Sequence, residues 1–218
     1  YLPEAVINFL ALLGWNPGEE GSELFSLDEL VKLFDLSKCS KNGAKFDFVK
    51  AAWFNHQYMI RREDSEWAPE YGKVLAEQGI EASVEQMAEV VRMMKTKVIE
   101  YVDAQNNKKK RNISFASDLW PLTKFFFVAP ATFDKDDKFI KKNWKETTAE
   151  DMQKFAAVLE TVNEWTVEGM KAVCDPWVEE SGMKPWNAWR VCLVGEGQGP
   201  DMYELAAFLG KEETLRRI

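Results

Sequence analysis

Apolar residues recur at helical spacing along almost the whole chain, and this periodicity most constrains the fold. In residues 83–102, Met87, Val90, Val91 and Met94 fall on one face of a helix. Similar helical patterns occur in residues 3–13, 27–34, roughly 113–127, the segment after 147 and roughly 166–180. No segment shows the strict alternation of a half-buried strand, and 103–111 is a polar interruption. The sequence therefore predicts an all-α fold.

Helix boundaries are marked by capping residues and by proline and glycine. Ser26 with Glu29, and Ser83 with Gln86, are capping-box pairs, and Thr147 with Glu150 suggests a third. Pro176 is expected to kink or break the helix over 166–180, because proline lacks an N–H group.

The last thirty residues predict two short helices joined by a glycine-rich elbow at 194–200. Leu205, Phe208 and Leu209 follow Pro200 at helical spacing, and Gly210 provides a stop. The simpler interpretation is a helical hairpin that closes a bundle. Alternatively, the glycines let a ligand approach the backbone closely. Periodicity alone leaves both interpretations open.

Composition restricts the possible functions only mildly. A net charge of −8 argues against an extended nucleic-acid surface. However, two clusters of basic residues, at 108–111 and 135–145, break the acidic background of the sequence. No run of eighteen apolar residues is present, so no membrane partner is expected. Cys39, Cys174 and Cys192 have no zinc-ligand spacing and favour a reducing compartment. The chain begins in mid-pattern without Met, which suggests a piece of something longer.

Catalytic and metal-binding constellations are not found. His56 is the only histidine and has no nucleophile or metal ligand near it in sequence, so a structural or surface role is expected. There is no P-loop and no dinucleotide-binding glycine motif. Aromatic residues are expected in the core rather than in stacking roles, namely Phe125–Phe127, Trp53, Trp120, Trp186 and Trp189.

Several short motifs together resemble the C-terminal region of bacterial-type glutamyl-tRNA synthetases. The tail carries an Arg-x-x-Leu-x-Gly elbow, then Gly-Pro and Leu-Gly-Lys-Glu. The matching residues are Arg190, Leu193, Gly195, Gly199, Pro200, Leu209, Gly210, Lys211 and Glu212. Upstream, the resemblance includes Leu2–Val6, Leu12–Trp15, the stretch at 40–47, Trp53, Asn55 and Tyr58. The combination is specific, although no single motif is.

The resemblance implies two consecutive helical bundle subdomains of the class I synthetase anticodon-binding type. Residues 1–130 would be the stem-contact subdomain and residues 131–218 the anticodon-binding subdomain. In the full-length enzyme, glutamate is attached to tRNA-Glu with ATP and Mg²⁺, whereas this region is expected to hold no cofactor and to be inactive alone. Its expected partners are tRNA-Glu and the catalytic domain of the same polypeptide, in a cytoplasmic monomer.

The same resemblance assigns candidate tRNA-binding residues. Arg111, beside Lys110, matches an arginine that recognises the third anticodon base. The alternative interpretation is that Arg111 belongs to a run of solvated surface charges. The other bases would meet Arg190 and the elbow residues Val194, Gly195, Glu196 and Gly197. Val194 stands where the family has threonine, so the backbone would read the bases there. The alternative for Arg190 is a helix-surface ion pair.

A helical protein–protein interaction module without RNA binding is the rival hypothesis, supported by the acidic charge and apolar helices. A basic stripe that joins Arg111, Lys141, Lys142 and Arg190 would favour RNA. An exposed apolar groove would favour a protein partner.

Overall fold

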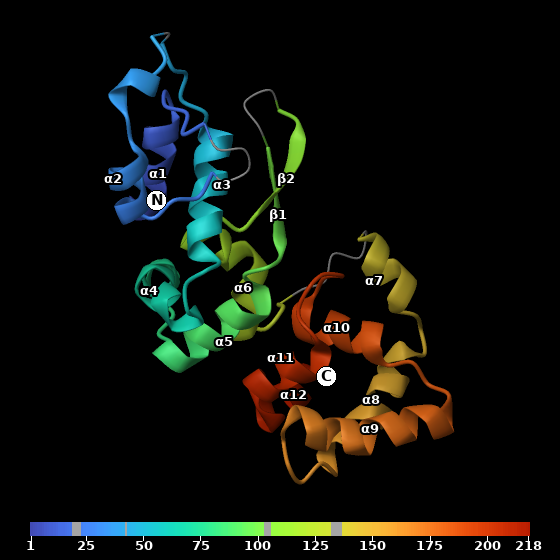
Figure 1. Cartoon of the computed structure of the whole chain (residues 1–218). Coiled ribbons are helices and arrows are strands. Elements are labelled where there is room, and N and C mark those ends of the chain that lie inside the picture. The colour runs from blue at the N-terminus through green and yellow to red at the C-terminus, as the bar shows by residue number, and fades with distance from the viewer. Residues whose placement is uncertain (19–22, 42, 103–105, 132–136) are drawn as a thin grey trace. The chain divides into compact units, whose positions relative to one another are not determined.

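A computed structural model describes residues 1–18, 23–41, 43–102, 106–131 and 137–218 of the chain, and most of these residues are helical (Figure 1). The chain forms two compact units, Tyr1–Trp120 and Pro121–Ile218. The sequence placed the subdomain boundary at 130/131, ten residues further along. Helix α6 (Trp120–Phe127) begins at the structural boundary, and its Phe126 ring lies edge-on against Phe208 with centroids 5.0 Å apart. Phe208 is part of the second unit, and the contact places α6 with it.

The first unit combines five α-helices, three short 3₁₀ helices and a two-stranded sheet among its described residues. The α-helices are α1 (Pro3–Leu12), α2 (Leu27–Leu33), α3 (Phe48–Met59), α4 (Ala68–Glu77) and α5 (Val84–Met94). The 3₁₀ helices are η1 (Leu36–Lys38), η2 (Asp64–Trp67) and η3 (Ala116–Asp118), and the strands are β1 (Val98–Val102) and β2 (Lys108–Asn112).

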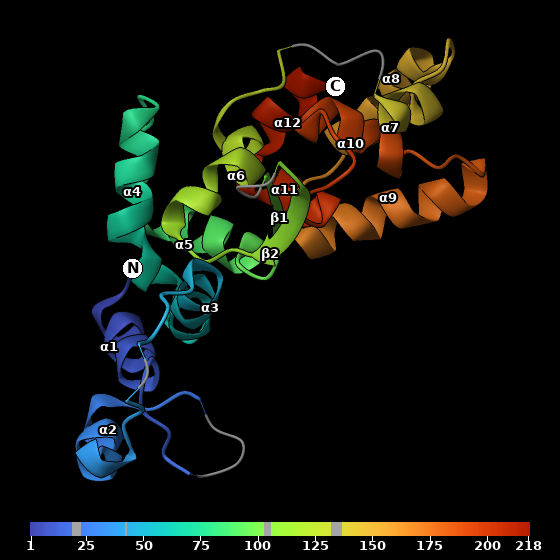
Figure 2. The ribbon, with the colours of Figure 1, turned by 90° about the horizontal axis from the view of Figure 1, so that it is seen from above.

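Helices α1 and α3 lie side by side (Figures 1 and 2) and bury a shared apolar cluster. Phe9 of α1 and Phe54 of α3 are at its centre, with ring centroids 5.8 Å apart. Trp15, Phe25 and Leu30 form a neighbouring cluster that α2 covers. These two clusters hold the N-terminal half of the unit together by apolar burial.

The capping predictions are confirmed at two of three positions. Ser26 accepts a hydrogen bond from the Glu29 N–H at 3.3 Å, and the Glu29 carboxylate accepts one from the Ser26 N–H at 2.7 Å. Ser83 and Gln86 make the equivalent pair. At the third position the predicted helix start is correct, with Thr147 at the N-cap of residues 148–160, but the Thr147 side chain makes no cap bond to its helix.

The prediction that no strand is present is wrong at residues 98–112, although the fold is mostly helical as expected. The helix predicted over 83–102 ends at Met94, and β1 then pairs with β2 in an antiparallel hairpin. Strand β1 consists of Val-Ile-Glu-Tyr-Val, and β-branched and aromatic residues suit a pleated, half-buried surface. Asn106, with a φ of 62°, lies in the connection, where asparagine tolerates the left-handed conformation. The first three residues of the predicted 103–111 loop lie outside the described residues.

All the regular secondary structure in the described residues of the second unit is helical. After α6 it contains α7 (Lys138–Asn143), α8 (Thr148–Glu160), α9 (Val167–Ser181), α10 (Trp186–Val194), α11 (Met202–Leu209) and α12 (Lys211–Arg217). Helix α9, long and nearly straight in Figure 2, contains Pro176, so the predicted break at this proline is wrong.

Aromatic rings from three helices build the core of the second unit. Trp189 of α10 is fully buried, and its ring lies edge-on against Phe155 of α8 and Tyr203 of α11, with centroids 5.1 and 5.7 Å apart. The Tyr203 hydroxyl donates a hydrogen bond to Asp175 at 2.7 Å. Cys174 and Cys192 are buried free thiols in this unit, and burial raises the pKa of Cys192 to about 12. Along the described chain, we find no helix with the length and apolarity that a membrane crossing needs.

Candidate nucleic-acid interface

Arg111 lies on β2, and its guanidinium is held in place by residues of its own unit. It donates two parallel hydrogen bonds to Asp118, at 2.5 and 2.7 Å, and a third to the Asn112 carbonyl at 3.2 Å. It also lies over the rings of Tyr101 and Phe115, 5.7 and 5.3 Å from their centroids. The side chain is 24% exposed. Arg111 is therefore a positioned cation with three of its five N–H groups engaged, rather than part of a solvated charge run.

The remaining residues of β2 present cations to solvent. Lys108, Lys109 and Lys110 are all exposed. Lys110 pairs with Glu100 across the sheet at 3.1 Å, with both side chains more than half exposed. An exposed pair of this kind is weak and easily exchanged for another anion. The edge of the hairpin can therefore offer positive charge to a phosphate backbone.

The elbow between α10 and α11 is tightly packed at its glycines. Gly195 ends α10 with a φ of +80°, which strongly favours glycine. A side chain at Gly197 would begin 3.0 Å from the Phe139 ring of α7, and one at Gly199 would begin 2.8 Å from Arg190 Nη1. The absence of side chains at Gly197 and Gly199 thus leaves space that Phe139 and Arg190 of the same unit occupy. This favours the helical-hairpin interpretation for those two positions.

Arg190 of α10 is hydrogen-bonded to the far end of the elbow. Its Nη2 donates to the Pro200 carbonyl at 3.0 Å, and its Nη1 is buried without a hydrogen-bond partner among the described residues. Burial lowers the pKa of this guanidinium, and Asp201 partly offsets the effect. No ion pair of Arg190 occurs in the part of the chain that the structure describes. Val194 is also buried, whereas Glu196, Gly197 and Gln198 form an exposed tip.

Helix α7 brings exposed lysines next to this tip. The Phe139 ring lies 3.0 Å from where a side chain at Gly197 would begin, and Lys138, Lys141 and Lys142 of the same helix are exposed. Lys135, which begins the basic cluster predicted at 135–145, lies outside the described residues. The second unit therefore has a basic helix beside an exposed backbone segment, a suitable arrangement for phosphate contact.

The candidate residues thus fall into two groups, one in each unit. Arg111 and Lys110 share β2, whereas Arg190, Val194, Gly195, Glu196 and Gly197 belong to one elbow. The sequence prediction overlooked the surface around Trp53, which is exposed rather than part of the core. Its helical neighbours Val49 and Phe48 are also exposed, so the apolar residues at 46–49 just before it were the available signal.

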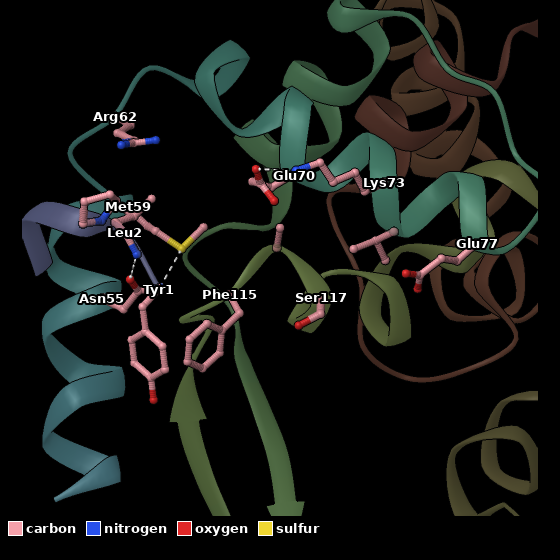
Figure 3. A pocket seen from close by; sticks show the side chains of 13 residues that line it. Tyr1, Leu2, Asn55, Met59, Arg62, Glu70, Lys73, Glu77, Phe115 and Ser117 are labelled. Carbon is pink, nitrogen blue, oxygen red and sulfur yellow. Dashed lines mark hydrogen bonds and ion pairs between the residues drawn. The ribbon is translucent and has the colours of Figure 1, made fainter. Parts of the chain in front are cut away.

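A separate cavity of about 550 Å³ opens in the first unit between α3, α4 and η3 (Figure 3). Its two cations are already paired, Arg62 with Glu4 at 2.7 Å and Lys73 with Glu70 at 2.9 Å. Tyr1 and Phe115 close one side with their rings edge-on. No group of three or more metal-ligating side chains comes together within the described ranges. This cavity offers neither net positive charge nor a catalytic arrangement.

Comparison with known proteins identifies the class. The profile of a family described as the anticodon binding domain matches residues 75–218, which cover all of the second unit and the hairpin of the first. The chain belongs to this family. 

The similarity to individual proteins extends over the whole chain. It is 51% identical to a glutamate–tRNA ligase of Phocaeicola vulgatus and 47% identical to one of Bacteroides fragilis, in both cases over all of this chain and 40% of the relative. A crystal structure of a glutamate tRNA ligase from Elizabethkingia meningosepticum superposes with a TM-score of 0.83 at 37% identity, again covering 100% of this chain and 40% of that one. The chain thus spans about 40% of the length of the relatives it matches.

Proposed function

We propose that the chain is the tRNA-binding, anticodon-recognising C-terminal part of a glutamate–tRNA ligase. The observation that carries this proposal is the similarity of the whole chain, at up to 51% identity, to one portion of such ligases. The full-length protein attaches glutamate to tRNA-Glu with ATP and Mg²⁺, using a catalytic domain in the rest of the polypeptide. The chain alone is inactive in aminoacylation. The protein acts as a monomer in the cytoplasm.

The two candidate surfaces have different tasks in this proposal. Residues 1–130 contact the tRNA stem and present Arg111 to the third anticodon base, with Lys110 on an adjacent phosphate. Residues 131–218 hold the rest of the anticodon loop through the exposed backbone of Glu196 and Gly197. The buried Val194 and Arg190, together with Gly195, fix the shape of the elbow and act as positioning residues.

The distribution of charge supports RNA binding despite the net charge of −8. Exposed lysines gather on β2 and on α7, next to the two sets of candidate residues. Phosphate neutralisation releases counterions, so binding carried by these lysines falls steeply as the salt concentration rises.

The proposal is tested by measuring the affinity of the chain for tRNA-Glu across a salt series. We expect binding at low salt, with log K falling linearly against log salt concentration. Replacing one phosphate-contacting lysine, Lys109→Ala or Lys141→Ala, reduces that slope by about 1. Lys73→Ala, at the paired cation of the α4 cavity, is the matched control and leaves the slope unchanged.

Two outcomes would contradict the proposal. Binding that is insensitive to salt would mean that the lysines do not meet phosphate. Failure to bind tRNA at low salt would favour the protein-interaction rival, for which the exposed apolar residues of α2 and α3 would be the first surface to examine.

A further inference from the structure

Trp53 forms part of a small open groove between α3 and the hairpin. Helix α3 contributes residues at positions 49, 52, 53 and 56, which share one helical face, and the hairpin contributes Val98, Lys110, Arg111 and Asn112. The cavity is about 320 Å³, near the lower end of the range of roughly 300–1,000 Å³ for ligand pockets. Its size and open shape suit one planar ring rather than a duplex.

The groove is preformed, because two hydrogen bonds tie α3 to the end of β2. His56 Nδ1 contacts the Ile113 carbonyl at 2.7 Å, and the Asn55 amide donates to the Ser114 carbonyl. Ile113 and Asn55 are buried at this junction. The free-energy cost of ordering the groove walls when a ligand binds is therefore small.

The polar end of the groove has a defined hydrogen-bonding pattern. A carbonyl can only accept, so His56 Nδ1 must carry the proton that meets Ile113. In the neutral ring, Nε2 is then an acceptor, and Asn112 Nδ2 donates to it at 3.3 Å. The Asn112 carboxamide keeps its oxygen and a second N–H, and the residue is exposed. One donor and one acceptor side by side match the edge of a nucleobase.

Charge favours a nucleotide over an apolar side chain as the occupant. Lys110 lines the groove itself, and Lys108 and Lys109 continue along the same exposed strand. A phosphate backbone that follows β2 would pass the mouth of the groove. The combination of an aromatic wall with a line of cations is the arrangement by which proteins hold single-stranded nucleic acid.

We propose that this groove holds one unpaired nucleobase of the bound RNA, stacked on Trp53, with its edge at Asn112 and its phosphate beside Lys110. The inference rests on the proposed tRNA-binding function and adds a specific nucleotide site to it. It assigns functions to Trp53 and Asn112 that the sequence did not reveal.

The experiment measures the affinity of the chain for a fluorescently labelled anticodon stem-loop of tRNA-Glu at low salt. Trp53→Ala should weaken binding by about 5- to 150-fold, the range expected for loss of one stacked base. Trp53→Phe, which keeps an aromatic face, should weaken it less. Phe48→Ala is the matched control, since Phe48 is an apolar residue of the same helix, 72% exposed and outside the groove.

A second series locates the base. Each loop nucleotide is replaced in turn by an abasic one, and a single position should lose affinity in the wild-type chain but not in Trp53→Ala. Asn112→Ala, a change at an exposed residue, should alter the preference among the four bases at that position even if Trp53→Ala fails to fold.

The outcomes separate the two proposals. Wild-type binding that is unchanged in Trp53→Ala, with no abasic position dependent on Trp53, would overturn the groove alone. Unaltered base preference in Asn112→Ala would remove its role at the base edge. A wild-type chain that binds no RNA would overturn the proposed function and the groove together.

Discussion

Arg111 and Asp118 form a bidentate ion pair that organises the segment after the hairpin. The two guanidinium–carboxylate distances are 2.5 and 2.7 Å, and Asp118 is only 9% exposed. The same carboxylate accepts the backbone N–H groups of Ser114 and Phe115, at 2.8 and 3.0 Å. The pair therefore fixes the arginine before any RNA arrives, which reduces the cost of ordering it on binding.

Breaking this pair is expected to destabilise the first unit strongly. In Asp118→Ala, a partly buried guanidinium and two backbone N–H groups lose their acceptor. We expect the free energy of unfolding to fall by on the order of 3 kcal/mol, as for other buried pairs that lose one partner. Urea unfolding followed by circular dichroism measures this change.

The double variant Arg111→Ala/Asp118→Ala measures the interaction free energy between the two residues. Its destabilisation should be smaller than the sum of the single changes, because neither residue is then left unpaired. Strict additivity would mean that the observed contact does not contribute to stability. Arg111→Ala alone leaves Asp118 unpaired and is expected to destabilise the unit. Its effect on RNA recognition must therefore be measured on protein that has been shown to be folded.

Side chains at elbow positions 197 and 199 are expected to be accommodated poorly. Gly199→Ala places a methyl group 2.8 Å from Arg190 Nη1, whose guanidinium is restrained by its hydrogen bond to Pro200, and Gly197→Ala places one 3.0 Å from the Phe139 ring. Each should lower the free energy of unfolding by about 1–3 kcal/mol, the usual cost of overpacking. Gln198→Ala, at the exposed residue between them, is the control and should have little effect. Equal stability of all three variants would show that the elbow is loosely packed.

Glu213 should contribute to the acid stability of the second unit. Hydrogen bonds from Arg216, and secondarily from Arg217, lower its pKa to about 2. An unfolded glutamate has a pKa of roughly 4.3, so the stabilisation is complete above that pH and is lost as the pH falls towards 2. The Arg217 side chain is 3% exposed and also donates to the Phe125 carbonyl at 2.6 Å, so the pair anchors α12.

The measurement compares Glu213→Gln with the wild type in unfolding experiments at pH 7, 4 and 2. Glu213→Gln should be less stable at pH 7, and the difference should shrink below pH 4 and disappear near pH 2. Glu212→Gln, one residue earlier and exposed, serves as control. A difference that persists unchanged at pH 2 would contradict the role of the Glu213 charge.

The sequence predicted elements whose signals are local. Ser26 with Glu29 defined a helix start because both partners lie within four residues, and Gly210 ended α11 because its positive φ suits glycine. The hairpin was overlooked because Val98 extends the helical pattern of α5, although the β-branched and aromatic content of β1 was a usable signal. Periodicity cannot choose between two patterns that share residues.

The candidate site was less predictable because its contacts join distant residues. Arg190 and Gly199 were identified from a motif, yet their mutual contact depends on how the elbow folds back. Trp53 was expected in the core, since large aromatic residues are usually buried. It is exposed instead, and the residues that share its groove belong to the hairpin, more than forty residues later in the chain.

The most direct test of the central claim compares binding of the chain to tRNA-Glu and to copies with one anticodon base exchanged. We predict that each read base contributes about 1–3 kcal/mol, which corresponds to roughly a 5- to 150-fold loss of affinity. The loss should persist across the salt series, because base contacts add to the phosphate contacts. Equal affinity for all the anticodons at every salt concentration would contradict anticodon recognition by this chain.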